Sequence, residues 1–362
     1  MKVKFTNLYK LISEKKKIFN KINLLIKKSS FVGGKDVKNF EKNFAKFVGS
    51  KFCVSLGNGT DALEIAVISL NLKKGTEIII PVNTWISTAE AIKNNGYKII
   101  FCDVNLDDYS ICLKDLRKKI SKKTSAIIAV HLYGNPTDMN SIKKIINGKN
   151  IKIIEDCAQA HGSRIKNKHV GTFGNIGTFS FFPGKNLGAF GDGGAVVTNS
   201  KSIAEFCERA KNHGALKKYD HAFSGRNSRL DTLQAAILNI KLKNYNNAIL
   251  KRNNLAKIYF KELKNIKNLD LFNLKKNYRY NFHQFVVRTS NRNKLQKYLN
   301  KKGISSMIHY PYMLNELNFF PNSNLKKAKN LGKKILSLPI SEEHTQKEIK
   351  YISNCIKNFF HK

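Results

Sequence analysis

Short apolar runs alternate with helical patterns over roughly residues 50 to 200. The apolar runs are rich in isoleucine and valine, and each is bounded by polar residues or glycine, as buried parallel strands are. They occupy residues 75–82, 97–104, 125–134, 151–157, 176–182 and 195–198. The helical patterns between them cover residues 60–72, 87–95 and 115–123. This alternation predicts an α/β fold with a mostly parallel sheet that helices cover on both faces.

The rest of the pattern predicts a long helical stretch and a second, smaller unit. Residues 201–265 are helical in pattern throughout. Residues 8–28 fit a helix that docks on the protein, with a peripheral membrane helix as the alternative. Beyond residue 280, strands at 283–289 and 305–311 alternate with helices. We therefore expect an N-terminal helical segment (1–30), a large domain (31–250) and a smaller α+β C-terminal domain (251–362).

The large positive charge of the chain does not change the predicted class of protein. The 362 residues are 42% hydrophobic and carry a formal net charge of +40, which at first sight is typical of a nucleic-acid-binding protein. Only nine of the 65 basic residues are arginine, however, and the lysines are spread along the chain rather than gathered on one element. We interpret the excess as a solvated surface that attracts anionic small molecules, without a nucleic-acid site.

The cysteines and the N-terminus bear on the cellular location. The six cysteines show neither a CxxC pair nor nearby histidines at metal-ligand spacing. The sequence therefore predicts free thiols in a reducing compartment and no metal site. The basic N-terminus lacks the apolar core of a secretion signal, and no stretch approaches the roughly 18 apolar residues that cross a bilayer. These patterns predict a cytoplasmic protein without a membrane partner.

One lysine stands out by its position. Lys185 lies in FSFFPGKNLGAFGDGGAV (179–196), in the turn between an apolar strand and a glycine-rich segment that leads to the next strand. Burial at such a turn lowers the pKa of a lysine and leaves its amine free to attack a carbonyl. Composition alone favours an ordinary surface lysine, so the other strand ends have to decide between the two interpretations.

Two further strand ends carry residues that suit a ligand site. GNGTDAL (57–63) places glycines at a strand-to-helix turn and a Thr60 side chain that caps the helix, whose first amides then face an anion. Such a turn is common in α/β folds and is weak support by itself. PVNTWIST (81–88) carries the only tryptophan, Trp85, whose ring suits either the core or a stacked ligand.

A fourth strand end carries a buried acid. IIEDCAQAHG (153–162) closes an apolar strand with Asp156, followed by Gln159 and His161. A carboxylate at this place is costly unless a cationic partner lies nearby. Because ligand sites of open α/β sheets gather at the carboxyl ends of the strands, we expect this acid and Lys185 to belong to one site.

Together with GRNSRLDTLQAAIL (225–238), these motifs resemble the DegT/DnrJ/EryC1/StrS family of sugar aminotransferases. Motif order and spacing agree in four places, and the resemblance runs from about Phe31 to residue 339. It implies an aspartate-aminotransferase-like fold (fold type I) and the cofactor pyridoxal 5′-phosphate.

The resemblance assigns the cofactor contacts residue by residue. Lys185 matches the lysine that binds the cofactor covalently and later moves a proton between the substrate and the cofactor. Asp156 matches the carboxylate that keeps the ring nitrogen protonated, so that the ring withdraws electrons. The other matches are Gln159 near the phenolic oxygen, Trp85 stacked on the ring, and Gly59, Thr60 and Ser180 around the phosphate.

Further residues follow from the same resemblance. Asn227 matches an asparagine that reaches the phosphate from the neighbouring subunit, which implies a homodimer with shared active sites. His309, Tyr310 and Pro311 resemble a segment near the substrate, although a core role explains them equally well. His161 is open in the same way between a structural and a catalytic role.

The implied reaction is transamination. An amino acid, with glutamate as first choice, would donate the amino group to a keto group of a nucleotide-linked deoxy sugar, at position 3 in preference to position 4, for amino-sugar and polysaccharide biosynthesis. One rival is a sugar dehydratase of the same family, in which a histidine replaces the anchoring lysine; Lys185 argues against it. The other is a non-catalytic regulatory or nucleic-acid-binding relative, against which the intact set of Lys185, Asp156, Gln159 and Ser180 argues.

Overall fold

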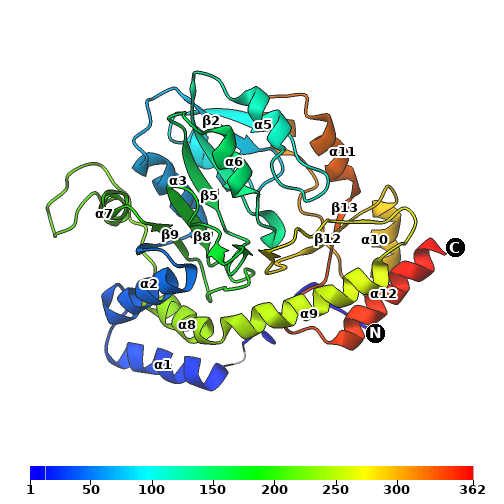
Figure 1. Cartoon of the computed structure of the whole chain (residues 1–362). Coiled ribbons are helices and arrows are strands. Elements are labelled where there is room, and N and C mark those ends of the chain that lie inside the picture. The colour runs from blue at the N-terminus through cyan, green and yellow to red at the C-terminus, as the bar shows by residue number, and fades with distance from the viewer. Residues whose placement is uncertain (13, 362) are drawn as a thin grey trace.

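The computed structural model describes residues 1–12 and 14–361 and contains a central seven-stranded sheet (Figure 1). The strand order is β1-β9-β8-β5-β4-β2-β3, and only β9 runs against its neighbours. The strands are β1 (Phe52–Leu56), β2 (Glu77–Pro81), β3 (Lys98–Cys102), β4 (Thr124–Val130), β5 (Lys152–Asp156), β8 (Ile176–Ser180) and β9 (Gly194–Thr198). All the predicted apolar runs therefore contain strands, and the sheet is mostly parallel as expected.

Helices cover both faces of this sheet and hide its apolar side chains from water (Figure 1). The isoleucines of β2 and β4 are fully buried, which explains why these strands appear as continuous apolar runs. The covering helices are α2 (Gly34–Val48), α3 (Gly59–Ser69), α4 (Ser87–Lys93), α5 (Leu113–Lys119), α6 (Met139–Ile145), α7 (Lys201–Ala210) and α8 (Thr232–Lys243).

The prediction of helix throughout residues 201–265 is wrong in its middle. Between α7 and α8 the chain forms a loop, and a second interruption separates α8 from α9 (Tyr245–Leu263). The loop folds back on the end of α7, where the Arg226 amide donates to the Ala210 carbonyl at 2.8 Å and Asn212 pairs with Asn227. Backbone groups that form hydrogen bonds with a distant segment cannot also form the hydrogen bonds of a helix. The local sequence pattern does not show such long-range partners.

A smaller unit follows, in which a three-stranded antiparallel sheet packs with helices. Its elements are β10 (Asp270–Leu271), β12 (Phe285–Arg288), α10 (Arg292–Lys301), α11 (Lys326–Lys334), β13 (Ile335–Leu338) and α12 (Gln346–Phe360). The strand predicted at 305–311 is wrong: only Met307 pairs, with Ser337, and β13 is the strand beside β12. The predicted boundary at 250/251 falls inside α9, which runs from the large sheet to this unit (Figure 1).

The N-terminal segment is partly as expected. The helix predicted over 8–28 is α1 (Lys15–Lys27), which is shorter, packs against α8 and buries Ile18 and Leu25. Ahead of it, the chain crosses to the small unit, where Val3 is buried and pairs with Ile304. The first residues therefore belong to the packing of the C-terminal unit, which no local pattern indicated.

The remaining global expectations concern membranes and thiols. Within residues 1–12 and 14–361, no helix combines the length and the apolar run needed to cross a bilayer. All six cysteines are free thiols, and five of them are buried. The absence of a disulfide framework stays a prediction.

Candidate active site

The predicted residues converge where the parallel strands end. Asp156 is the last residue of β5 and Ser180 the last residue of β8, and the two strands are direct neighbours. Gly59 opens α3 just after β1, and Trp85 follows β2. Lys185 lies in the loop between β8 and β9, so one edge of the sheet carries all of these residues.

Lys185 has the environment that its position in the sequence predicted. Burial lowers the pKa of its amine, and the nearby Asp156 carboxylate acts in the opposite direction. Its loop is fixed locally, because the Lys185 amide donates to the Phe182 carbonyl at 2.8 Å. A lysine whose pKa is lowered by burial and that lies near a carboxylate suits nucleophilic attack on a carbonyl group.

The Asp156 carboxylate is buried and held by hydrogen bonds. The Thr88 hydroxyl donates to Oδ2 at 2.9 Å, and the Ala158 amide donates to Oδ1 at 3.1 Å. The partners nearest to this carboxylate are therefore a hydroxyl and an amide. A cationic group of a ligand, such as a protonated ring nitrogen, would supply the countercharge that burial calls for.

An anion cradle lies at the start of α3. A Cβ atom on Gly59 would come within 2.6 Å of the Ser180 Cβ, so only glycine lets the first turn of the helix approach this hydroxyl. Thr60 lies next to it, and its hydroxyl is 2.8 Å from that of Ser87. Free amides at a helix N-terminus together with hydroxyl groups fit a phosphate, and the donor set therefore fits the phosphorylated cofactor.

The prediction that Thr60 caps this helix is wrong. Asn58 is the N-cap: its side chain accepts from the Asp61 amide at 2.8 Å. The Thr60 hydroxyl is thereby left for the cradle. The glycine-rich segment after Lys185 passes against the same turn, because a Cβ on Gly194 would lie 2.1 Å from the Asn58 carbonyl oxygen. This close approach accounts for a glycine at that position.

The small unit contributes a polar segment to the site. The Gln159 side chain accepts from the Tyr133 amide at 2.6 Å and donates to the Tyr310 hydroxyl at 3.1 Å. Burial raises the pKa of Tyr310, so the phenol keeps its proton. Because Gln159 is the donor in their hydrogen bond, this proton can be donated to another acceptor. Trp85 is 57% exposed, and its ring centroid lies 5.6 Å from that of Tyr310. The exposed Trp85 ring thus packs beside that of Tyr310.

His309 precedes Tyr310 and has a defined tautomer. Ser337 donates its proton to Gln284 at 3.0 Å, so the Nδ1 of His309, 3.0 Å from the Ser337 oxygen, must be the donor. Its carbonyl oxygen accepts from the Tyr133 hydroxyl. Burial and the Lys185 charge lower the pKa of His309 to about 4, so the ring is neutral near pH 7 and its Nε2 carries a lone pair. Pro311 follows in the same segment and is exposed, so it does not belong to the core.

His161 is enclosed by aromatic rings. It is fully buried near Phe44, Phe179 and Phe181, and neither ring nitrogen has a hydrogen-bond partner among the residues that the structure describes. Burial, and next the charge of Lys185, lower its pKa to about 3. These surroundings favour the structural role that the sequence left open.

The titration of His161 gives a testable pH dependence. The unfolded chain protonates this histidine below its ordinary pKa of 6.5, but the folded chain does so only near 3. Stability from this site is therefore lost as the pH falls from about 6.5 to 3, at about 1.4 kcal/mol per pH unit. We expect His161→Leu to unfold with a shallower pH dependence in thermal melts over this range, with activity retained. An unchanged slope, or a folded but inactive variant, would refute the structural role.

Asn227 lies in the loop between α7 and α8 and its side chain is exposed. Its neighbours hold the loop to α3 of the same chain. Ser228 accepts from the Gly57 amide at 3.0 Å and donates to Asp61 at 2.6 Å, and Arg226 forms ion pairs with Asp61 and Glu64. The structure therefore does not bring the Asn227 amide into contact with the cradle residues of its own chain.

Several polar residues near the site were not predicted. His283 bonds to Asn186, the residue after Lys185, at 2.8 Å, and Asn281 donates to the carbonyls of Gln159 and His161. Thr88 lies inside a quoted motif, yet a threonine among many gave no signal of its contact with Asp156. These contacts join residues far apart in sequence, so only the fold reveals them.

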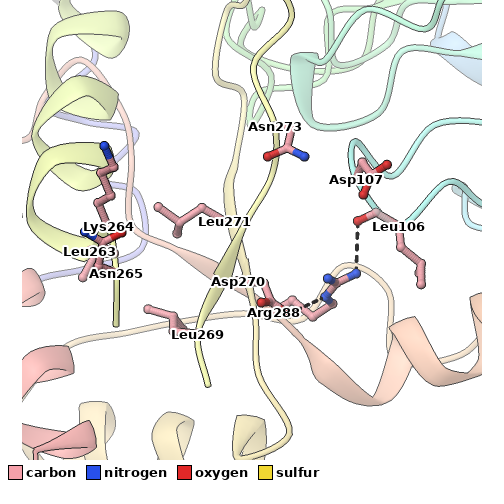
Figure 2. A pocket seen from close by; sticks show the side chains of 10 residues that line it. All are labelled: Leu106, Asp107, Leu263, Lys264, Asn265, Leu269, Asp270, Leu271, Asn273 and Arg288. Atoms are coloured by element: carbon pink, nitrogen blue, oxygen red, sulfur yellow. Dashed lines mark hydrogen bonds and ion pairs between the residues drawn. The ribbon is translucent and has the colours of Figure 1, made fainter. Parts of the chain in front are cut away.

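Two other features do not belong to the site. His131, Glu155 and Cys157 lie close together, but the Glu155 carboxylate is occupied by His131 and by the amides of Gly171, Phe173 and Gly174, so the group is a buried structural network. Figure 2 shows a pocket of about 330 Å³ between the two units, in which Arg288 bonds to Asp270 and to the Leu106 carbonyl. None of the predicted site residues lines this pocket.

Comparison with known proteins identifies a family. A model of the DegT/DnrJ/EryC1/StrS aminotransferase family matches residues 12–357. The chain is 36% identical over 347 residues to the dTDP-3-amino-3,6-dideoxy-alpha-D-galactopyranose transaminase of Aneurinibacillus thermoaerophilus, with 95% of each chain covered.

Solved structures are similar over the whole chain. S. venezuelae DesV in complex with a ketimine intermediate matches with a TM-score of 0.97 and 31% identity, over 100% of this chain and 99% of that chain. Bacillus subtilis ntda with bound cofactor PMP matches with a TM-score of 0.93 and 27% identity, over 100% and 86% of the two chains. These similarities confirm the predicted fold class.

Proposed function

Because the chain belongs to the DegT/DnrJ/EryC1/StrS aminotransferase family, we propose that it transfers an amino group from an amino acid to a keto group of a nucleotide-linked deoxy sugar. Family membership confirms the prediction of an aminotransferase that uses pyridoxal phosphate, whose amino form, PMP, is bound in the B. subtilis relative. The observation that carries the proposal is the desolvated Lys185 amine facing Asp156 beside the anion cradle.

Each residue has a task in this proposal. Lys185 would hold the cofactor and would move the proton at the reacting carbon of the substrate. Asp156 would keep a proton on the ring nitrogen, and the cradle of Gly59, Thr60 and Ser180 would bind the phosphate. When bound, the cofactor supplies a carbon that accepts the amino group and a charged ring that withdraws electrons.

The substrate side is proposed from the small-unit segment. Tyr310 keeps a free hydroxyl proton and His309 a free lone pair, which suit the hydroxyl and keto oxygens of a sugar. The Trp85 ring is exposed beside Tyr310 and suits stacking on the cofactor ring. The exposed aromatic ring and the neutral polar groups favour a sugar over a strongly charged acceptor.

The choice of substrate can be tested by turnover. We expect glutamate to convert the bound cofactor to its amino form, and dTDP- or UDP-linked 3-keto deoxy sugars to convert it back faster than their 4-keto isomers. The preference for position 3 is supported by the 3-amino sugar in the name of the A. thermoaerophilus transaminase. If glutamate converts the cofactor to its amino form but neither 3-keto nor 4-keto sugars convert it back, the proposed function is wrong. If 4-keto sugars react faster than 3-keto sugars, only the proposed preference for position 3 is wrong.

A homodimer with shared sites is the second part of the proposal. The Asn227 side chain is exposed, while Arg226 and Ser228 on either side fasten its loop to α3. An amide held rigidly but turned away from its own chain suits a contact with a second copy, where it would donate to the cofactor phosphate.

Asn227→Ala is expected to weaken cofactor retention by about one to two orders of magnitude without unfolding the subunit, because a hydrogen bond to a charged group is lost. Mixing this variant with Lys185→Ala at limiting cofactor should restore partial activity after subunit exchange. One of the two sites in each heterodimer would then carry both intact residues. Activity no higher than the sum of the two variants, in a sample shown to contain heterodimers, would exclude the shared site.

A further inference from the structure

The beginning of α4 touches both ends of the site at once. Its first two residues are Ser87 and Thr88: the Ser87 hydroxyl lies 2.8 Å from that of Thr60, and the Thr88 hydroxyl donates to Asp156 at 2.9 Å. Ser87 is 6% exposed and Thr88 is fully buried, so water does not compete for either bond. Two adjacent hydroxyls thus connect the cradle with the carboxylate.

We propose that Thr88 and Ser87 are positioning residues for the cofactor, with Thr88 orienting the Asp156 carboxylate toward the ring nitrogen and Ser87 orienting the Thr60 hydroxyl toward the phosphate. This inference rests on the proposed function, which takes Asp156 and Thr60 as cofactor contacts. In this proposal neither Ser87 nor Thr88 has to contact the cofactor itself. Each acts through the residue that it holds.

The contacts of Thr88 define the direction of its hydrogen bonds. The Asp156 carboxylate accepts, so Thr88 donates, and the Thr84 hydroxyl at 2.9 Å must in turn donate to Thr88. Thr84 is 3% and Asp156 4% exposed, so this chain of hydroxyls is dry. With the Ala158 amide on the other oxygen, both carboxylate oxygens are fixed.

α4 is itself held in place at both ends. At its start Ser87 meets Thr60 of α3, and after its end the Asn94 side chain donates to Glu64 of α3 at 2.8 Å. A helix fixed at two points to the helix that carries the cradle keeps the distance between cradle and carboxylate constant. That distance must match the span of the cofactor from phosphate to ring nitrogen.

The test compares hydroxyl-deleting variants that keep the side-chain shape. Thr88→Val is expected to lower kcat by about tenfold or more, because a hydrogen bond to a charged group is lost. It should also move upward the pH at which the absorption of the bound cofactor changes, since a loosely held carboxylate leaves less positive charge on the ring. Thr88→Ser keeps the hydroxyl and should restore both values.

Ser87→Ala should have a different signature. It is expected to raise the dissociation constant of the cofactor severalfold in equilibrium dialysis and to leave the pH of the absorption change where it is. Thr198→Val is the matched control: Thr198 is 4% exposed and bonds to the Asn175 carbonyl at 2.7 Å, at the far end of the sheet. This control should change thermal stability alone.

The outcomes separate this inference from the proposed function. If Asp156→Asn, measured in parallel, leaves kcat and the absorption unchanged, the proposed function fails. If Asp156→Asn is impaired but Thr88→Val behaves like Thr198→Val, only the positioning role is overturned. Should Thr88→Val not fold, Thr84→Val replaces it, with a smaller shift in the same direction expected and no shift counting against the inference.

Discussion

Replacing Lys185 by alanine is expected to abolish transamination while the protein still binds the cofactor non-covalently. The amine is the group that attaches the cofactor and moves the proton, and no neighbouring side chain offers the same chemistry: Asp156 is held by Thr88, and His309 has its pKa lowered to about 4. Cofactor binding survives because the cradle of Gly59, Thr60 and Ser180 is untouched. Turnover with glutamate and a keto sugar measures the loss.

A second readout of Lys185 does not depend on activity. Borohydride reduction of the loaded wild-type protein should fix the cofactor to the peptide that contains Lys185, as seen by mass spectrometry, and should fix nothing in Lys185→Ala. Lys241→Met is the control, since Lys241 is another lysine whose pKa burial lowers, and it should label normally. Labelling at another lysine, or wild-type turnover by Lys185→Ala, would show that the anchoring lysine has been misassigned.

The large sheet could be predicted because its strands are buried on both faces. Consecutive positions such as Ile78, Ile79 and Ile80 of β2 are then all apolar, and the limits of such runs follow from the polar turns that water requires. The chemistry at strand ends followed from the same logic, since Asp156 and Ser180 end neighbouring strands. The sequence pattern did not predict the order of the strands in the sheet. For example, β9 lies between β1 and β8 although it comes last of the seven in sequence.

The wrongly predicted segments have one feature in common: contacts with residues far away in the sequence determine their structure. Residues 305–311 have the apolar content of a strand, but Ile335–Leu338 takes the place beside β12 and leaves Met307 with a single pairing. The loop after α7 looks helical, yet its amides bond across to Ala210 and Lys211. Local pattern records burial and propensity, and it does not record which remote groups compete for the backbone.

The site was predictable in its reactive residues and not in their support. Lys185 and Asp156 follow apolar runs, where a buried charge is costly without a partner, and this cost singled them out. Thr88 lies 68 residues before Asp156 and looks like any helical threonine, so its contact is visible only in the fold. The roles of the individual residues stay predictions until the variants are measured.

Asp156→Asn is expected to keep the fold and to lower kcat by at least about 10²- to 10³-fold. An asparagine can still accept from the Ala158 amide, but it carries no charge to hold a proton on the ring nitrogen, so the ring withdraws electrons less strongly. The measurement is single-turnover conversion of the loaded variant with glutamate, together with a thermal melt. Near-normal conversion would show that this carboxylate is structural.

The adjacent acid provides the matched control. Glu155 is fully buried, and although burial acts to raise its pKa, the bonds from His131, Gly171 and Gly174 outweigh burial, so its pKa is lowered from 4.5. Its stabilising contribution is therefore present above pH 4.5 and lost as the pH falls below it. Glu155→Gln should destabilise the fold by about 3–5 kcal/mol, because amides that faced a carboxylate now face an NH₂ group. It should also lack this acid-dependent loss, while the folded fraction converts glutamate at close to the normal rate. The two variants should then have different defects: Asp156→Asn loses activity and keeps its stability, whereas Glu155→Gln loses stability and keeps its activity. If both variants showed the same defect, the assignment of a chemical role to Asp156 and a structural role to Glu155 would be wrong.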